Sequence, residues 1–444
     1  MPWDRTSLWL APFDDPAAAV LVAGGTDAIL QPRFGPDGSL YYLSDESGHW
    51  NLYRRSPGGR VERVVDLPYD CARPPWQLGT QSYGFLDGDR LVFTYHREGR
   101  DRLAVIGEDG RPVDVDVPLT DVGATLATGP GTVLCAGATP YRPSALTMID
   151  LTDVAKPAST TLRAAAERPV PEAAVSEPVY FGYDAGDGTI GHAILNLPKN
   201  DAYQPSGTGP PPLIVTVHGG PTSHVTAAYL PIVQYWTSRG FAHLAVNYAG
   251  SSGYGRAYRR RLDGRRGVAD VQDVIAACRH LAAAGLVDER RIAVRGGSAG
   301  GYTALTALAF TDYFAAGASY YGVTDLELLA RSTHKFEAGY LDVLVGPLPG
   351  AIEVYRARSP RTAAGHITVP LALFAGARDA VAPLSQAVEM SQELTTRGVP
   401  HVFRVFGGED HGFRTAASVS EALALETDMY AAAFGLPVTT APRR

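Results

Sequence analysis

Three side chains in the second half of the sequence have the types and order needed to break an acyl bond. Ser298 stands at the centre of Gly296–Gly300, a G-x-S-x-G pentapeptide between a predicted strand and a predicted helix. A sharp turn of this kind needs small flanking residues and holds the serine above a sheet. The helix N-terminus would place the N–H of Ala299 beside a developing oxyanion. Taken alone, the pentapeptide could also be a helix N-cap in a glycine-rich loop.

A serine nucleophile needs a base, and the base needs a group that orients it. Asp379 follows the predicted strand 371–374, and His411 follows the predicted strand 401–406. The order Ser, Asp, His is the one expected on an α/β-hydrolase sheet, and both loops would lie at the edge that carries Ser298. Alone, Asp379 could cap a helix and His411 could be a solvated loop residue. Together with the elbow, they favour a triad.

A second oxyanion donor is predicted in the segment His218-Gly219-Gly220-Pro221, which follows the apolar strand 213–217. An HGG-type loop at this place turns a backbone N–H toward the substrate oxygen. Gly219 and Gly220 both remain candidates, and a tight turn without catalytic role is the alternative. His218 precedes the nucleophile, so we assign it to loop structure.

Other polar segments are given structural roles. Glu409 and Asp410 adjoin His411 in sequence, which makes a hydrogen bond to its ring awkward. The glycine-rich stretch 247–255 lacks the Lys-Ser/Thr of a phosphate loop, so no nucleotide site is expected. Arginines after this stretch are predicted to form a solvated helix face: Arg259, Arg260, Arg261, Arg265 and Arg266. Aromatic and apolar residues near the elbow are more typical of core than of a pocket: Tyr302, Tyr320, Tyr321 and Val323.

From about residue 178, apolar strand runs alternate with helical periodicity, which indicates a mainly parallel sheet covered by helices. Predicted strands are 213–217, 242–248, 292–294, 371–374 and 401–406, and predicted helices are 268–281, 299–310, 383–396 and 421–434. The Pro- and Gly-rich stretch 199–212 is predicted to be a surface loop or hinge.

Up to about residue 165, short strands alternate with Gly, Pro and Asp turns. The turns Asp37-Gly38 and Asp87-Gly88 lie 50 residues apart, and a degenerate third turn occurs at 128–131. A repeat of this length is typical of four-stranded propeller blades, although a β-sandwich with coincidental spacing is the alternative. We therefore expect a partial β-propeller domain at 1–170 and an α/β-hydrolase domain at 171–444.

The composition excludes several classes of protein. The chain has 444 residues, a net charge of −7 and 19% charged residues, with no basic stripe for nucleic acid. The three cysteines have no C-x-x-C spacing, so buried thiols are expected and neither a disulfide framework nor a metal site. No cofactor is expected. The amino-terminal residues show no export signal and apolar runs are too short to span a bilayer, so the predicted location is the cytoplasm.

The motifs HGGP, NYAGSSGYG, GVADVQD, GGSAGGY, GARDAVAP and GEDHGFR stand in this order in the second half. They resemble the prolyl oligopeptidase family of serine peptidases, especially its acylaminoacyl-peptidase and dipeptidyl-aminopeptidase-like branch. The resemblance implies a propeller that restricts access to short peptides. It also implies Ser298 as nucleophile, Asp379 as acid, His411 as base, and backbone donors from Ala299 and the HGG loop.

The first half departs from the family, because about 165 residues are roughly half of what a full propeller of this family needs. We expect either a piece of a longer protein or a short propeller completed by a homo-oligomer or a second chain. The predicted function is hydrolysis of amide bonds in short peptides or N-acylated aminoacyl compounds through an acyl-enzyme. Two alternatives stay open: an esterase or amidase acting on a small natural product, and a catalytically dead propeller scaffold that binds protein.

Overall fold

The computed structural model describes residues 1–88, 90–107, 109–166, 170–202 and 209–437. Contacts within the chain define two compact units. The first unit is Met1–Tyr180, Thr222–Gln234 and Ser251–Arg260, and the second is Phe181–Pro221, Tyr235–Gly250 and Arg261–Arg444. The limits 1–170 and 171–444 remain a prediction about which parts fold as domains. The predicted loop 199–212 lies partly outside the described residues.

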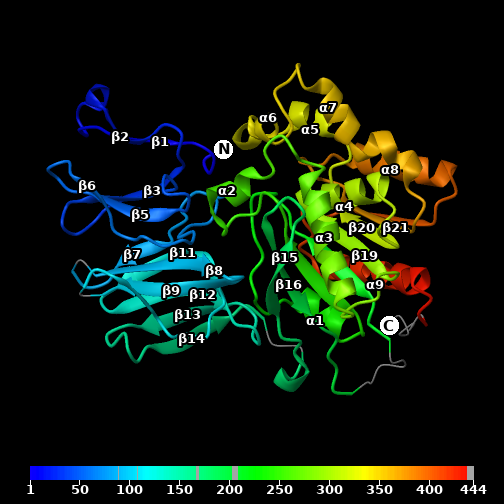
Figure 1. Ribbon diagram of the computed structural model, residues 1–444, viewed down its shortest axis with the longest axis horizontal. Coiled ribbons are helices and arrows are strands. Elements are labelled where there is room, and N and C mark those ends of the chain that lie inside the picture. Colours follow the sequence, from blue (N-terminus) through cyan, green and yellow to red (C-terminus); the bar gives the residue numbers. More distant parts are fainter. Residues whose placement is uncertain (89, 108, 167–169, 203–208, 438–444) are drawn as a thin grey trace. The chain divides into compact units, whose positions relative to one another are not determined.

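Small antiparallel sheets make up most of the first unit, where they follow one another in chain order (Figure 1). A two-stranded sheet, β1(Ser7–Leu10) and β2(Val20–Gly24), precedes the four-stranded sheets β3(Ile29–Phe34) β4(Leu40–Ser44) β5(Asn51–Arg55) β6(Val61–Arg63), β7(Tyr83–Phe85) β8(Leu91–Arg97) β9(Arg100–Ile106) β10(Pro112–Asp114), and β11(Asp121–Gly129) β12(Thr132–Ala138) β13(Ala145–Asp150) β14(Ala158–Ala164). The predicted propeller-like, all-β character of this region is confirmed.

The repeated turns of the sequence occupy equivalent places in the three four-stranded sheets. Gly38, Gly88 and Gly131 precede β4, β8 and β12 and have φ values of +74°, +56° and +59°. Side chains with a Cβ rarely adopt this conformation, so glycine is favoured at each turn. The spacing of these glycines therefore corresponds to the length of chain that forms one four-stranded sheet.

Apolar side chains from neighbouring sheets share one core in the first unit. Val92, Leu126, Val133 and Ile149 are fully buried in a cluster that joins the β7–β10 and β11–β14 sheets. Because side chains alternate along a strand, each sheet can offer an apolar face to its neighbour. This packing is the arrangement expected between propeller blades.

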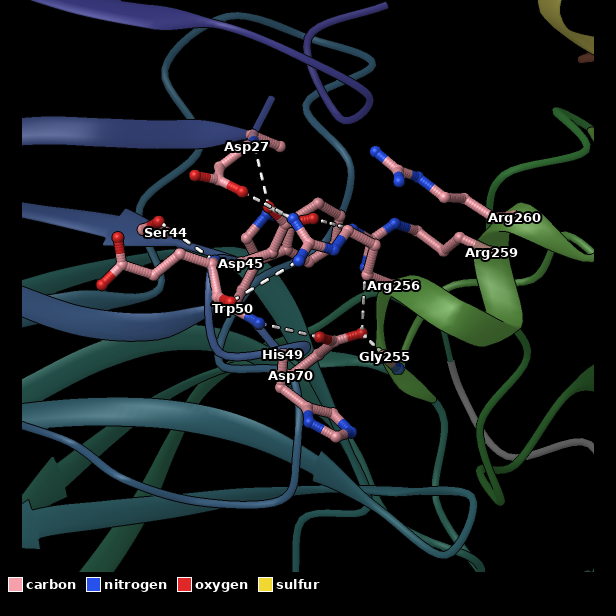
Figure 2. A network of polar contacts seen from close by, with 12 residues as sticks. Asp27, Ser44, Asp45, His49, Trp50, Asp70, Gly255, Arg256, Arg259 and Arg260 are labelled. Atoms are coloured by element: carbon pink, nitrogen blue, oxygen red, sulfur yellow. Dashed lines mark hydrogen bonds and ion pairs between the residues drawn. The ribbon is translucent and has the colours of Figure 1, made fainter. Parts of the chain in front are cut away.

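One of the predicted solvated arginines is buried in the first unit. Arg259 is only 6% exposed; it pairs with Asp45, and its guanidinium lies 3.7 Å from the ring centre of Trp50 (Figure 2). Asp70 also faces it, with 3.6 Å between the nearest nitrogen and oxygen. The prediction of a solvated face is wrong at this residue, because buried carboxylates compensate its charge.

The second unit is built on an eight-stranded sheet. Its spatial order is β15(Val179–Asp184), β16(Ile190–Asn196), β18(Ala242–Asn247), β17(Leu213–Val217), β19(Ile292–Gly297), β20(Ala316–Tyr320), β21(Leu371–Gly376) and β22(His401–Phe406). Strands from β18 to β22 pair in parallel, whereas β16 runs antiparallel to β18. The predicted α/β-hydrolase architecture is confirmed.

Helices cover both faces of this sheet. In chain order, the helices of both units are α1(Pro231–Thr237), α2(Gly255–Arg260), α3(Ala269–Ala283), α4(Ala299–Phe310), α5(Leu326–Ser332), α6(Tyr340–Leu344), α7(Ile352–Arg358), α8(Leu384–Thr396) and α9(Ala416–Ala433), with short 3-10 turns η1(Pro16–Ala18), η2(Glu172–Ala174), η3(Lys335–Glu337) and η4(Pro360–His366). Of these, α2, η1 and η2 belong to the first unit. On β19, Gly296 packs against α4, whereas the adjacent Arg295 contacts α9. Because adjacent residues of a strand face opposite sides of the sheet, these two helices lie on opposite faces. No helix in the described ranges is long and apolar enough to cross a membrane.

Candidate active site

The turn between β19 and α4 holds Ser298 in a strained conformation. Its φ is 54° and its ψ is −120°, an unusual pair of angles for a residue with a side chain. Neighbouring glycines allow the close approach: a Cβ on Gly296 would lie 2.4 Å from the Gly300 carbonyl, and one on Gly300 would lie 2.0 Å from the Val217 oxygen. The strand-turn-helix context that the pentapeptide requires is therefore present.

Ser298, Asp379 and His411 are brought together at the carboxyl edge of the sheet. His411 Nε2 lies 2.8 Å from Ser298 Oγ, and His411 Nδ1 lies 2.8 Å from Asp379 Oδ2. Asp379 follows β21 and His411 follows β22, two strands that pair in parallel. The imidazole thus connects the hydroxyl to the carboxylate in hydrogen-bond geometry.

The second oxygen of Asp379 is also occupied. Its Oδ1 accepts hydrogen bonds from the backbone N–H groups of Val381 and Ala382, both at 2.8 Å. These two bonds fix the plane of a carboxylate that is only 8% exposed. Asp379 therefore stabilises the turn after β21 and faces His411 at the same time. It does not cap the following helix, because α8 begins after Pro383 and has no side-chain cap.

The neighbouring acids have other partners. Glu409 accepts hydrogen bonds from the N–H groups of Arg414 and Thr415 at 2.9 and 3.0 Å. Its bond with the Thr415 hydroxyl and the backbone donors lower the pKa of Glu409 to about 2. Asp410 pairs with Arg378, with 3.3 Å between nitrogen and oxygen. Each carboxylate thus has a structural role apart from the imidazole.

The predicted oxyanion loop lies against Ser298. A Cβ on Gly219 would come within 3.1 Å of the Gly297 carbonyl and 3.6 Å of Ser298 Cβ. Gly220 has a φ of +82°, which favours glycine. Ala299 is the first residue of α4, and helix-terminal N–H groups have no partner within the helix. The HGG loop and the first turn of α4 therefore both adjoin Ser298.

His218 is a packed residue of this loop. Its ring stacks on Tyr248 with 4.4 Å between centroids, and the Tyr248 hydroxyl donates to the His218 carbonyl at 2.9 Å. Burial lowers the pKa of His218 to about 4, so the ring is neutral at pH 7. The predicted assignment of His218 to loop structure agrees with these contacts.

Another predicted surface arginine supports the start of α4. Arg266 is only 4% exposed, and its guanidinium donates to the Ala299 carbonyl at 3.0 Å. Its guanidinium carbon also lies 4.6 Å from the ring centre of Tyr302. The predicted solvated position is wrong for Arg266, because the helix carbonyl and the aromatic ring hold it inside.

Tyr321 packs against His411 and against the residue that precedes Ser298. Its ring lies 5.0 Å from the His411 ring in an edge-on arrangement, and a Cβ on Gly297 would clash with it at 2.9 Å. Its φ is 41°, an uncommon value for a bulky residue, and its N–H donates to the Phe374 carbonyl at 2.7 Å. The sequence did not reveal this position, because the direction of the ring depends on the backbone conformation after β20.

A buried ion pair lies beneath the elbow. Arg295, on β19, donates to both oxygens of Glu426 on α9 at 2.7 and 3.2 Å. The Tyr320 hydroxyl donates to the same carboxylate at 2.5 Å, and the Tyr320 carbonyl accepts the N–H of Ser298 at 3.0 Å. The ion pair thus links β19 to α9 close to Ser298.

Comparisons with known proteins agree with this site. The eight-stranded sheet, the elbow and the Ser–His–Asp contacts define a serine hydrolase of the α/β-hydrolase class. A profile of the prolyl oligopeptidase family matches residues 229–436. A puromycin-hydrolyzing peptidase of Mycobacterium tuberculosis is similar in structure, with a TM-score of 0.94 and 37% identity over 98% of this chain and 67% of that chain. The chain belongs to the prolyl oligopeptidase family.

Two further relatives extend the comparison. A puromycin hydrolase has a TM-score of 0.94 and 37% identity, with 100% of this chain and 67% of that chain covered. Dipeptidyl aminopeptidase BIII of Pseudoxanthomonas mexicana is 27% identical over 426 residues, which are 83% of this chain and 61% of that relative. The chain therefore spans about two thirds or less of the length of these relatives.

Proposed function

We propose that this chain hydrolyses amide bonds of short peptides or N-acylated aminoacyl compounds through an acyl-enzyme. The observation that carries the proposal is the position of His411, whose two ring nitrogens each lie 2.8 Å from an oxygen, one of Ser298 and one of Asp379. A base at this distance removes the serine proton during attack, and the carboxylate fixes its tautomer.

In the proposed mechanism, Ser298 Oγ attacks the substrate carbonyl while its proton moves to His411 Nε2. The N–H groups of Ala299 and of Gly219 or Gly220 stabilise the oxyanion. His411 then gives the proton to the leaving amine and later activates the water that releases the acyl group. Asp379 stays ionised and stabilises the imidazolium.

The relatives suggest which amides to test. Two similar structures are described as a puromycin hydrolase and a puromycin-hydrolyzing peptidase, and one curated relative is a dipeptidyl aminopeptidase. We therefore propose aminoacyl amides and short peptides as the substrate class. Hydrolysis of aminoacyl and dipeptidyl anilides should exceed that of matched short acyl esters. A strong preference for the esters would favour the esterase alternative.

A fluorophosphonate probe separates an active hydrolase from a dead scaffold. Such probes phosphonylate an activated serine, so one label per chain is expected on the Ser298 peptide by mass spectrometry. Ser332→Ala, a change at an exposed helix end, is the matched control and should label like the wild type. Absence of label on the folded wild-type chain would favour the protein-binding scaffold.

We also propose that a second copy or another chain completes the propeller. On β13, Thr147 and Ile149 are buried, whereas the alternating residues Leu146 and Met148 are 40% and 39% exposed. Leu162 on β14 is 52% exposed. An apolar sheet face of this kind is typical of a blade without its neighbour. Light scattering with size exclusion tests this, since a monomer with no bound chain would contradict it.

The cytoplasm is the proposed location. The three cysteines are unpaired and buried, in keeping with a reducing compartment. Cell fractionation tests it, and recovery of the native protein outside the cytoplasm would contradict it.

A further inference from the structure

Two histidines and an aspartate meet inside the first unit, outside the site described above. His96 on β8 and Asp101 on β9 are cross-strand partners of one hairpin. Such partners project from the same face of a sheet. His224 comes from the segment Thr222–Gln234 of the same unit. All three are buried, with exposures of 3% for His96, 4% for Asp101 and 8% for His224.

The three residues are close enough to share one ligand, and a direct hydrogen bond joins only one of the histidines to Asp101. One possible ligand atom from each of the three residues lies within 4.8 Å of the others. His96 Nδ1 lies 3.0 Å from Asp101 Oδ1, but His224 Nε2 lies 3.9 Å from the same oxygen. A gap of 3.9 Å is too long for a hydrogen bond.

The Nε2 atoms of His96 and His224 have no hydrogen-bond partner among the described residues. On its other side, His224 Nδ1 lies 2.8 Å from Ser252 Oγ. If Nδ1 carries the proton and donates to this hydroxyl, Nε2 presents a lone pair toward a carboxylate oxygen. Two electron-rich atoms then face each other in a buried place, which is unfavourable unless a cation lies between them.

The charge states of His224 and Asp101 suit metal ligands. Burial lowers the pKa of His224 to about 3, so its ring is neutral at pH 7. Burial alone would raise the pKa of Asp101, but Arg73 and the two imidazoles hold it well below its usual value. Neutral imidazole and ionised carboxylate are the forms that bind metal.

The charged residues around the cluster have a net negative charge, which favours a cation. Arg73 pairs with Oδ2 of Asp101, which leaves Oδ1 facing the imidazoles. The same guanidinium also pairs with Asp121 at 2.7 Å. Two carboxylates against one guanidinium give a local charge of −1. The Ser252 hydroxyl on His224 and the Arg73 guanidinium on Asp101 are outer partners of the kind that orient metal ligands.

We propose that His96, Asp101 and His224 form a binding site for a divalent transition-metal ion, with zinc as the best match to two imidazoles and one carboxylate. Three protein ligands of this set leave one position of a tetrahedral zinc for water. The bound ion would join the β8–β9 hairpin to the segment that begins directly after Pro221. The proposal is independent of the proposed peptidase function.

Isothermal titration of the chelator-treated, desalted full chain with zinc chloride tests the site. We expect one equivalent to bind and to raise the melting temperature. His96→Asn and His224→Asn should each raise the dissociation constant for zinc by more than about 100-fold. His334→Asn changes a histidine that is 52% exposed outside the cluster, and it should leave binding unchanged.

Ser252→Ala keeps all three ligands, so it tests the site even if a histidine variant folds poorly. Loss of this outer partner should weaken zinc binding by about 10- to 100-fold. Circular dichroism of each variant without metal checks the fold. The proposal is overturned if the wild-type chain binds no zinc, or if folded His96→Asn, His224→Asn and Ser252→Ala bind it as the wild type does.

Discussion

Glu426 on α9 accepts hydrogen bonds from Nε and Nη2 of Arg295, which stands three residues before Ser298. Glu426 is fully buried and Arg295 is 9% exposed. Removing one partner of such a pair leaves the other charge without compensation. The contact therefore couples the stability of α9 to the strand that carries the elbow.

Glu426→Gln should lower the free energy of unfolding by about 3 to 5 kcal/mol, because Arg295 would stay buried without its counter-charge. Urea denaturation measures the change. Glu421→Gln on the same helix is the matched control, since Glu421 and Arg404 are 45% and 47% exposed. The control should change stability by less than about 1 kcal/mol. Equal stability of the two variants would refute the coupling.

Tyr321→Ala should lower kcat about 100-fold, because loss of the ring allows His411 to move from the serine by a fraction of an ångström to an ångström. kcat/KM should fall equally, since the interaction matters in the transition state. Tyr321→Phe keeps the ring against His411, so this conservative variant should retain near-normal activity. If both variants behave alike on a peptide anilide, the ring has no positioning role.

The buried His243 predicts a loss of stability in acid. Burial lowers its pKa from 6.5 to about 3 in the folded chain. Between these values the unfolded chain binds a proton that the folded chain does not, so stability falls as pH decreases from 6.5 toward 3. The contribution is up to about 1.4 kcal/mol per pH unit.

His243→Gln should flatten this dependence, while its amide can still contact Thr216, whose hydroxyl lies 2.8 Å from the histidine Nε2. Urea midpoints from pH 7 to pH 4 measure the slope. The exposed-site control His334→Gln should follow the wild type. Parallel curves for His243→Gln and the wild type would show that another group sets the acid sensitivity.

The positions of Ser298, Asp379 and His411 could be predicted because their signals are local. An elbow needs small residues on both sides of the serine, and loops after parallel strands share one sheet edge. The glycine turns of the first unit are local in the same sense, since Gly38 and Gly88 report a positive φ that recurs with each sheet.

What the sequence did not reveal depends on distant parts of the chain. Arg259 and Arg266 look like solvated charges until Asp45 and the Ala299 carbonyl are placed beside them. The pairing of Arg295 with Glu426 joins residues 131 positions apart. Burial of a charge is set by the tertiary partner, so neither periodicity nor motif spacing predicts it.

The most direct test of the proposed catalysis is steady-state turnover of a short aminoacyl anilide by the wild type and by Ser298→Ala at equal concentration. The variant keeps the loop and the imidazole but lacks the attacking oxygen. The expected result is a loss of kcat on the order of 10⁴ or more. Near-normal turnover by the purified variant would contradict the assignment of Ser298 as the nucleophile.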